Sequence, residues 1–179
     1  SRGLGDVYKR QPCDPVIRLT MLLHDIGKPS VKRTDENGRD HFKTHADAGA
    51  KIAAEVLSKL KVSNNIYNKV TTLIKYHQSV ENVNDVKIKH WFNKIGEEYT
   101  LSLFDVRIAD LKAHNMGKKE VLFEIERLMS LEEEAKMIIK RREPYKISEL
   151  AVNGHDLISL GFSGREIGDK LSEILTLVM

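Results

Sequence analysis

The chain has 179 residues, of which 41% are hydrophobic and 31% are charged, and its formal charge is +3. This length can bury one sizeable core, and the composition is that of a globular protein rather than a disordered chain. The mildly positive charge does not by itself indicate a nucleic-acid partner. The single cysteine, Cys13, excludes an internal disulfide and favours a reducing, cytoplasmic compartment. No apolar run approaches the roughly 18 residues that cross a membrane, so we expect no membrane partner.

The first residues differ from the rest of the chain. Residues 1–11 have neither a helical nor a strand period, and we interpret them as a cloning or assembly scar or a disordered end. At Asp14 and Pro15, an N-cap residue precedes a proline at the first helical position. This pattern predicts an apolar helix that begins there and is stopped by Gly27 and Pro29.

That helix is expected to end within the sequence LLHDIGK at residues 22–28, in which His24 and Asp25 are adjacent. Neighbouring residues on a helix point about 100° apart, so such a pair converges on one ion only where a helix end fixes it. Taken alone, the pair is equally well explained as a C-terminal cap with a histidine near the helix dipole. A metal site would need further ligands from elsewhere in the chain.

The middle of the chain predicts a hairpin followed by helices. Residues 30–43 lack a helical period, and the turn signal Asn37-Gly38 predicts a loose hairpin there. Beyond it, apolar residues recur at helical spacing on one face of each segment, and the fold class is therefore all-α, a helical bundle. The expected helices are 44–61, 63–77, 85–96, 98–115 and 118–142, with Thr44, Ser63 or Asn64, and Asp85 as caps.

The sequence pattern changes at Glu143-Pro144, which is expected to break the last long helix. We expect the main helical domain to span residues 12–142 and a small helical tail to span 143–179. The tail contains a second His-Asp pair, His155-Asp156, after a turn. Asp156 falls in the first turn of a short helix, where a carboxylate is favoured by the dipole, so this pair is interpreted as a helix start.

Five metal-capable side chains lie on inward faces or ends of the expected helices. They are His24, Asp25, His45, His77 and Asp110. A carboxylate on an apolar face is costly unless it is paired or bound to a metal, and imidazole with carboxylate suits a divalent transition metal. Lys28 would lie one turn from such an ion, as a point charge for a phosphate oxygen.

Each of these residues also has a simpler explanation. His77 is equally a hydrogen-bonded core histidine, and His45 a surface residue at a helix start. Asp110 is able to pair with Arg107, His114 or a neighbouring helix. One shared pocket explains all five positions together, and His41 would then lie beside His45 as an outer-sphere group.

The same residues resemble the HD phosphohydrolase superfamily, whose pattern is a histidine, a His-Asp dipeptide and a distant aspartate. His24-Asp25 matches the dipeptide and Asp110 the aspartate. LLHDIGKP and the later HFKTHADAGA are similar to the HD region of bacterial CCA-adding tRNA nucleotidyltransferases, of the poly(A) polymerase family. AVNGHDLISLGFSGREIGDKLSEIL resembles the C-terminal tail of those enzymes, so the resemblance spans about residues 16–178.

The resemblance implies a metal-dependent phosphodiesterase or phosphatase in an HD-domain bundle. Its substrates would be phosphorylated or cyclic-phosphate nucleotides or RNA ends, and its ion Mn, Ni, Mg, Co or Fe. His24, Asp25 and Asp110 would hold a first ion, and His45 and His77 a second ion or the phosphate. Asp25 and Lys28 would be catalytic.

Two departures from the family pattern shape the expectation. No histidine precedes His24, where the superfamily has its first metal histidine, and no paired-aspartate pattern of a nucleotidyltransferase head is present. We therefore expect the C-terminal portion of such a protein. The alternative function is a non-catalytic helical body that binds tRNA.

Overall fold

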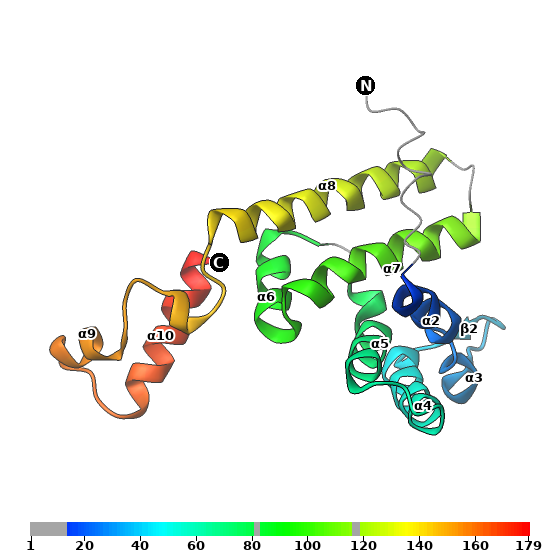
Figure 1. Ribbon diagram of the computed structural model, residues 1–179, viewed down its shortest axis with the longest axis horizontal. Helices are drawn as coiled ribbons and strands as arrows, with labels where there is room; N and C mark the ends of the chain where they lie inside the picture. Colours follow the sequence, from blue (N-terminus) through cyan, green and yellow to red (C-terminus); the bar gives the residue numbers. More distant parts are fainter. Residues whose placement is uncertain (1–13, 81–82, 116–118) are drawn as a thin grey trace. The chain divides into compact units, whose positions relative to one another are not determined.

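The computed structural model describes residues 14–80, 83–115 and 119–179, without the side chains of 114 and 115, so the segment predicted as a scar lies outside it. Within these residues the predicted all-α fold is confirmed, with one short hairpin as its sheet (Figure 1). The elements are α2 Pro15–Leu23, α3 Lys28–Val31, β1 Arg33–Thr34, β2 Asp40–His41, α4 His45–Lys59, α5 Asn64–Tyr76, η1 His77–Val80, α6 Asp85–Ile95, α7 Glu97–Asn115, α8 Lys119–Arg141, η2 Ile147–Glu149, α9 Gly154–Ser159 and α10 Arg165–Val178.

The chain divides into two compact units, each built from separate stretches of sequence. The first lies within Ser1–Asn82 and Leu101–Met129, and the second takes in Val83–Thr100 and Ser130–Met179. The domain boundary expected at 142/143 stays a prediction. Within the described ranges, no helix is both long enough and apolar enough to cross a membrane.

The first unit has its core where α5 packs against both α2 and α4, which lie beside it in Figure 1. The apolar stripes of these helices meet there, as their spacing predicts. Five fully or almost fully buried side chains form the centre of this core: Leu23, Ala53, Leu57, Val70 and Ile74. The ends of α2 and α5 lie close to the start of α4, since a Cβ atom at Gly49 would lie 3.4 Å from both the His24 carbonyl oxygen and Ile74 Cγ2.

The end of α2 differs from the prediction in one respect. Asp14 caps the helix as expected, accepting a hydrogen bond of 2.8 Å from Val16 N. However, α2 ends at Leu23, and Pro29 lies inside the short helix α3 instead of stopping α2. A proline is tolerated in a first helical turn because no helical partner for its missing N–H exists there.

The start of each later helix tests the predicted caps. Ser63 accepts from Ile66 N at 3.4 Å, as predicted for α5. The prediction for Asp85 is wrong by one residue, because Asn84 accepts from Lys87 N. Thr44 occupies the N-cap position of α4 as predicted, but its backbone is left-handed at φ 67° and its hydroxyl donates to the Lys43 carbonyl instead of accepting from the helix.

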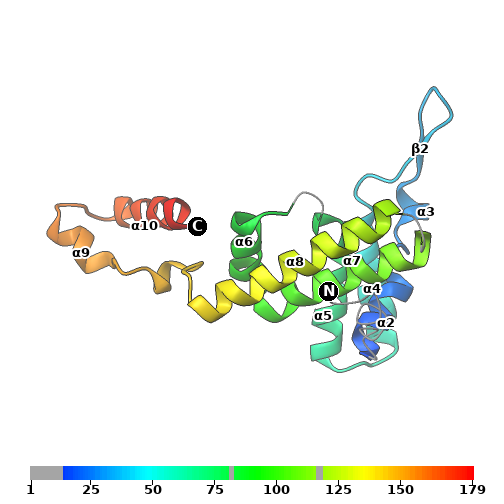
Figure 2. The same cartoon turned by 90° about the horizontal axis from the view of Figure 1, so that it is seen from above.

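The predicted hairpin is confirmed. Strands β1 and β2 are antiparallel, with Arg33 opposite His41 and Thr34 opposite Asp40. Asp35 closes the turn by accepting hydrogen bonds of 2.9 Å from the backbone N–H groups of residues 37 and 39. Figure 2 shows the hairpin projecting away from α3.

The second unit joins α6 to the residues after α8. The Tyr145 ring packs on Phe92, with centroids 5.3 Å apart, and its hydroxyl donates to Glu97. Burial, together with that carboxylate, raises the pKa of Tyr145. In the second His-Asp pair, Asp156 accepts from the N–H of Asn153, the N-cap of α9, at 2.8 Å and completes a capping box, which is the helix-start role expected of it.

Candidate metal centre

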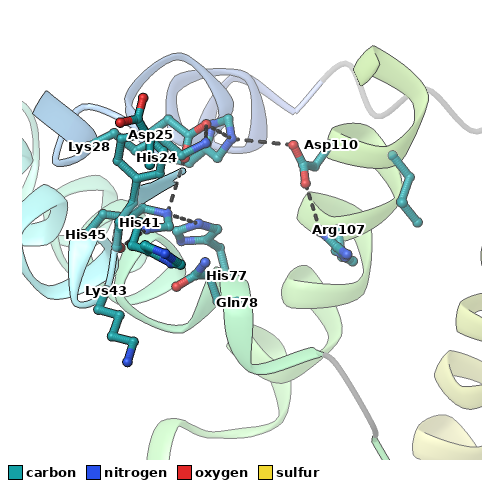
Figure 3. Close-up of a pocket in the computed structure, with 13 residues that line it drawn as sticks. His24, Asp25, Lys28, His41, Lys43, His45, His77, Gln78, Arg107 and Asp110 are labelled. Carbon is teal, nitrogen blue, oxygen red and sulfur yellow. Dashed lines mark hydrogen bonds and ion pairs between the residues drawn. The ribbon is translucent and has the colours of Figure 1, made fainter. Parts of the chain in front are cut away.

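The five predicted metal-ligating residues all belong to the first unit, and the structure gathers them around one pocket of about 650 Å³ (Figure 3). His24 follows the last residue of α2, Asp25 lies in the next turn, His45 begins α4 and His77 follows α5. Asp110 comes from α7, which faces the others across the pocket in Figure 3.

The distances within this set are short. Asp25 Oδ1 lies 3.3 Å from His45 Nε2, which lies 3.2 Å from His77 Nε2. Asp25, His45 and His77 each offer a ligand atom, all within 4.8 Å of one another. On the other side, His24 Nε2 lies 3.3 Å from Asp25 Oδ2 and 3.5 Å from Asp110 Oδ1. The shared carboxylate of Asp25 joins the two halves.

The three histidines are oriented in the same way. In each, Nδ1 makes a hydrogen bond to the backbone carbonyl three residues earlier: His24 to Met21 at 2.7 Å, His45 to Phe42 at 2.8 Å and His77 to Ile74 at 2.6 Å. A carbonyl only accepts, so Nδ1 must carry the proton. The neutral ring then presents the Nε2 lone pair to the pocket, which is the arrangement that prepares a histidine to bind a metal.

These residues fit a divalent cation. Two Nε2 lone pairs that face each other at 3.2 Å repel unless a proton or a cation lies between them. The His45 side chain is only 4% exposed, so water has little room to relieve that repulsion. Since two carboxylates complete the set, the pocket concentrates imidazole and carboxylate donors of the kind that first-row divalent metals prefer.

The pKa shifts follow the same electrostatics. When His24 is protonated, its Nε2–H donates to Asp110, and this hydrogen bond raises the pKa of His24 despite its burial. Burial lowers the pKa of His77, aided by the neighbouring His24 and His45 charges. Burial opposes ionisation of Asp25, but the hydrogen bond from Lys28 and the nearby histidines hold its pKa below the ordinary value. The carboxylate therefore remains an anion able to bind a cation.

Lys28, predicted to face a phosphate, lies at the rim of the pocket. Its Nζ is 2.6 Å from Asp25 Oδ2, and its side chain is 38% exposed. The ammonium group thus balances Asp25 while remaining open to solvent. His41 also lines the pocket, but its Nε2 pairs with Asp35 Oδ2 at 2.8 Å.

The sequence suggested one of the pairings but missed several residues that line the pocket. Arg107 NH1 donates to Asp110 Oδ2 at 2.9 Å, which is one of the alternatives left open for Asp110. Arg107 itself lines the pocket, and so does Gln78 (Figure 3). Their positions three residues before Asp110 and directly after His77 are the only signals that could have identified them.

The fold and the pocket together define a helical domain with a candidate divalent-metal centre. The HD domain family model matches residues 13–141. The chain therefore belongs to the HD domain family.

Two curated proteins are similar to parts of the chain. The A-adding tRNA nucleotidyltransferase of Deinococcus radiodurans is 26% identical over 140 residues, which are 74% of this chain and 32% of that protein. The CC-adding tRNA nucleotidyltransferase of Thermus thermophilus is 41% identical over 61 residues, which are 34% of this chain and 14% of that protein. The chain thus matches a third or less of the length of these relatives. No solved structure matches it.

Proposed function

We propose that this HD domain is a divalent-metal-dependent phosphohydrolase, a phosphodiesterase or phosphatase that acts on phosphorylated or cyclic-phosphate nucleotides or RNA ends. One observation carries the proposal. Three histidine Nε2 atoms, each oriented by a backbone carbonyl, and two carboxylates meet in one pocket of the described chain.

Asp25, His45 and His77 would hold the ion, with His24 and Asp110 completing the site or holding a second one. A divalent ion held there supplies Lewis acidity toward a phosphoryl oxygen and toward water. The ion would be Mn, Ni, Mg, Co or Fe, and the imidazole content of the site favours the transition metals over magnesium.

The chain's own cations would act on the phosphate. Lys28, at the rim, is positioned to stabilise negative charge on a phosphoryl oxygen, while it keeps Asp25 ionised. Across the pocket, Arg107 orients Asp110 through its guanidinium group. Asp25 would serve both as a ligand and as the group that fixes Lys28.

The test compares the two His-Asp pairs of the same chain. We expect hydrolysis of 2′,3′-cyclic AMP or p-nitrophenyl phosphate with added Mn²⁺, Ni²⁺, Co²⁺, Fe²⁺ or Mg²⁺. His24→Ala and His45→Ala should lower the rate by more than roughly 100-fold, the upper cost of losing an outer-shell partner. His155→Ala, in the second pair, should leave the rate unchanged. Equal rates for all three variants would contradict the proposal.

The second candidate function is a non-catalytic body that binds tRNA in the cytoplasm. It is favoured by the similarity to two tRNA nucleotidyltransferases. In that case the chain would bind tRNA with a strong dependence on salt and would bind no metal in calorimetry. Metal binding that His45→Ala abolishes would argue against this alternative.

A further inference from the structure

A second hollow lies beside the metal pocket, at the base of the hairpin. It has a volume of about 400 Å³ and is lined by Ser30, Val31, Lys32, Arg33, His41, Lys43 and Thr44. These seven residues, called the basic pocket below, include three cationic side chains, one histidine and no carboxylate. Such a lining attracts an anion.

The charges of the basic pocket are only partly neutralised. Lys32 pairs with Asp40 at 2.8 Å, and His41 pairs with Asp35. Arg33 and Lys43, in contrast, have no ion-pair or hydrogen-bond partner for their side-chain nitrogens among the described residues. The antiparallel register places Arg33 opposite His41, so the unpaired guanidinium lies on the same face of the hairpin as the histidine.

The basic pocket adjoins the metal pocket. His41 and Lys43 line both cavities. A ligand whose phosphate lies among His24, His45 and His77 therefore reaches the basic pocket by passing these two side chains. Isolated lysines on a hairpin are usually just solvated, but two adjoining cavities that share a lysine and a histidine suit a ligand with more than one phosphate.

We propose that the basic pocket binds the phosphate of the nucleotide next to the one in the metal pocket, so that the ligand is the phosphate-bearing end of an oligonucleotide. Arg33 and Lys43 contact this neighbouring phosphate. These two residues make binding depend on the length of the oligonucleotide, because a mononucleotide has no second phosphate for them to contact. The proposal rests on the phosphohydrolase function proposed above and names its substrate class.

The experiment measures binding in EDTA, so that it needs no catalysis. A fluorescent RNA tetranucleotide with a 3′-phosphate serves as the probe, and 3′-AMP serves as the competitor. Arg33→Gln and Lys43→Gln should each weaken probe binding about 3- to 10-fold and lower the salt slope by about 0.7, the value for one lost single-strand phosphate contact. For Arg33→Gln the affinity for 3′-AMP should stay the same, because Arg33 lines the basic pocket and not the metal pocket.

Arg39→Gln is the matched control. It removes the same charge from the same hairpin, but Arg39 lines neither cavity, so probe affinity should change less than 2-fold. Arg33→Lys should restore most of the binding, and circular dichroism should show the same helix content for every variant. Equal losses for Arg33→Gln and Arg39→Gln would overturn the proposal, as would equal losses for the tetranucleotide and 3′-AMP.

The two proposals fail separately. If metal-dependent hydrolysis is absent but the Arg33 and Arg39 variants still differ in binding, the phosphohydrolase function fails and the oligonucleotide site stands. If His45→Ala abolishes hydrolysis while the two arginine variants bind alike, the function stands and the basic pocket is not a phosphate site. With hydrolysis intact, Arg33→Gln should also lower kcat/KM for the tetranucleotide and not for 2′,3′-cyclic AMP.

Discussion

Gly27 occupies the point where the turn after α2 meets the start of α4. A Cβ atom at this position would lie 2.2 Å from the His45 carbonyl oxygen and 2.4 Å from Gly49 N. Both are backbone atoms, which cannot rotate away. We therefore expect Gly27→Ala to lower the free energy of unfolding by about 3 kcal/mol. It should also weaken metal binding, because the added methyl group would displace the backbone of His45 and with it the His45 ring. Urea denaturation and calorimetry would measure the two effects.

Gly168 is the control for this substitution. It lies in α10, exposed, and a Cβ there would meet nothing within 4 Å. Gly168→Ala should therefore stabilise the protein by roughly 0.5–1 kcal/mol, the helix-propensity difference. If Gly27→Ala and Gly168→Ala changed stability in the same direction, the close backbone contact at Gly27 would not explain the effect of Gly27→Ala.

At the scale of residues, the sequence predicted which side chains face inward but not how their rings turn. Helical spacing was enough to choose His77 and Asp110, because a face follows from a period of 3.6. The orientation of each ring depends on a carbonyl such as Ile74 O, and backbone carbonyls leave no signature in the sequence. The pairing of Lys28 with Asp25 was likewise not expected.

At the scale of elements, an ion pair joins α6 to the residue that follows α8 and its C-terminal turn. Lys89 is almost fully buried, and its Nζ lies 2.8 Å from Glu143 Oε2. The hydrogen bond from Lys89 lowers the pKa of Glu143, with a further contribution from Arg141. We expect Glu143→Gln to lower the free energy of unfolding by about 1–2 kcal/mol at pH 7, measured by urea denaturation.

The pH dependence of that difference has a definite sign. The folded-state pKa of Glu143 lies below the ordinary value of 4.5, so the unfolded chain binds its proton first as the pH falls. The stabilisation is therefore present above pH 4.5 and is lost as the pH falls through the folded-state pKa. Glu173→Gln, in an exposed pair with Lys170, should cost almost nothing at any pH. A constant cost for Glu143→Gln down to pH 2 would contradict this account.

The elements themselves were largely predictable. The helices α4 to α8 lie within two residues of their expected ranges, since long amphipathic segments give a strong periodic signal. Helix ends were harder. Thr44 has the residue type of a cap but adopts a left-handed backbone, and Pro29, which was expected to stop a helix, is the second residue of α3. Both depend on how the chain returns from α2 to α4, which is a tertiary effect.

At the scale of the whole molecule, a metal should stabilise one unit selectively. All five candidate ligands belong to the first unit, so binding at 100 times Kd should add about 2.7 kcal/mol to its stability. Hydrogen exchange should then slow in α2, α4 and α5 but not in α9 and α10 on addition of Mn²⁺.

His45→Ala and His155→Ala are the paired controls for this measurement. His45→Ala should remove the slowing, whereas His155→Ala should preserve it. Equal slowing along the whole chain, including α9 and α10, would show that the molecule unfolds as one cooperative unit and would contradict selective stabilisation.

The division into units could not be predicted from the sequence. The composition changes at Glu143-Pro144, but packing depends on contacts between distant segments. Tyr145, which follows that change, contacts Phe92 and Glu97, so the second unit includes α6 as well as the tail. Helical periodicity in the sequence carries no information about such a contact between segments that are distant in the chain.

The carbonyls that orient the histidines have a consequence for the lengths of the helices. Met21 and Ile74 belong to the last turns of α2 and α5, where carbonyl groups lack a helical partner. If either helix continued by one turn, its next backbone N–H groups would donate hydrogen bonds to these carbonyls. The histidine Nδ1–H would then lose the acceptor that orients the ring. A one-residue insertion between Met21 and His24 would also rotate the ring by about 100°. The pocket therefore constrains where two helices stop as strictly as it constrains which side chains follow them, and insertions at these two points should be tolerated less well than substitutions on the outer faces of the same helices.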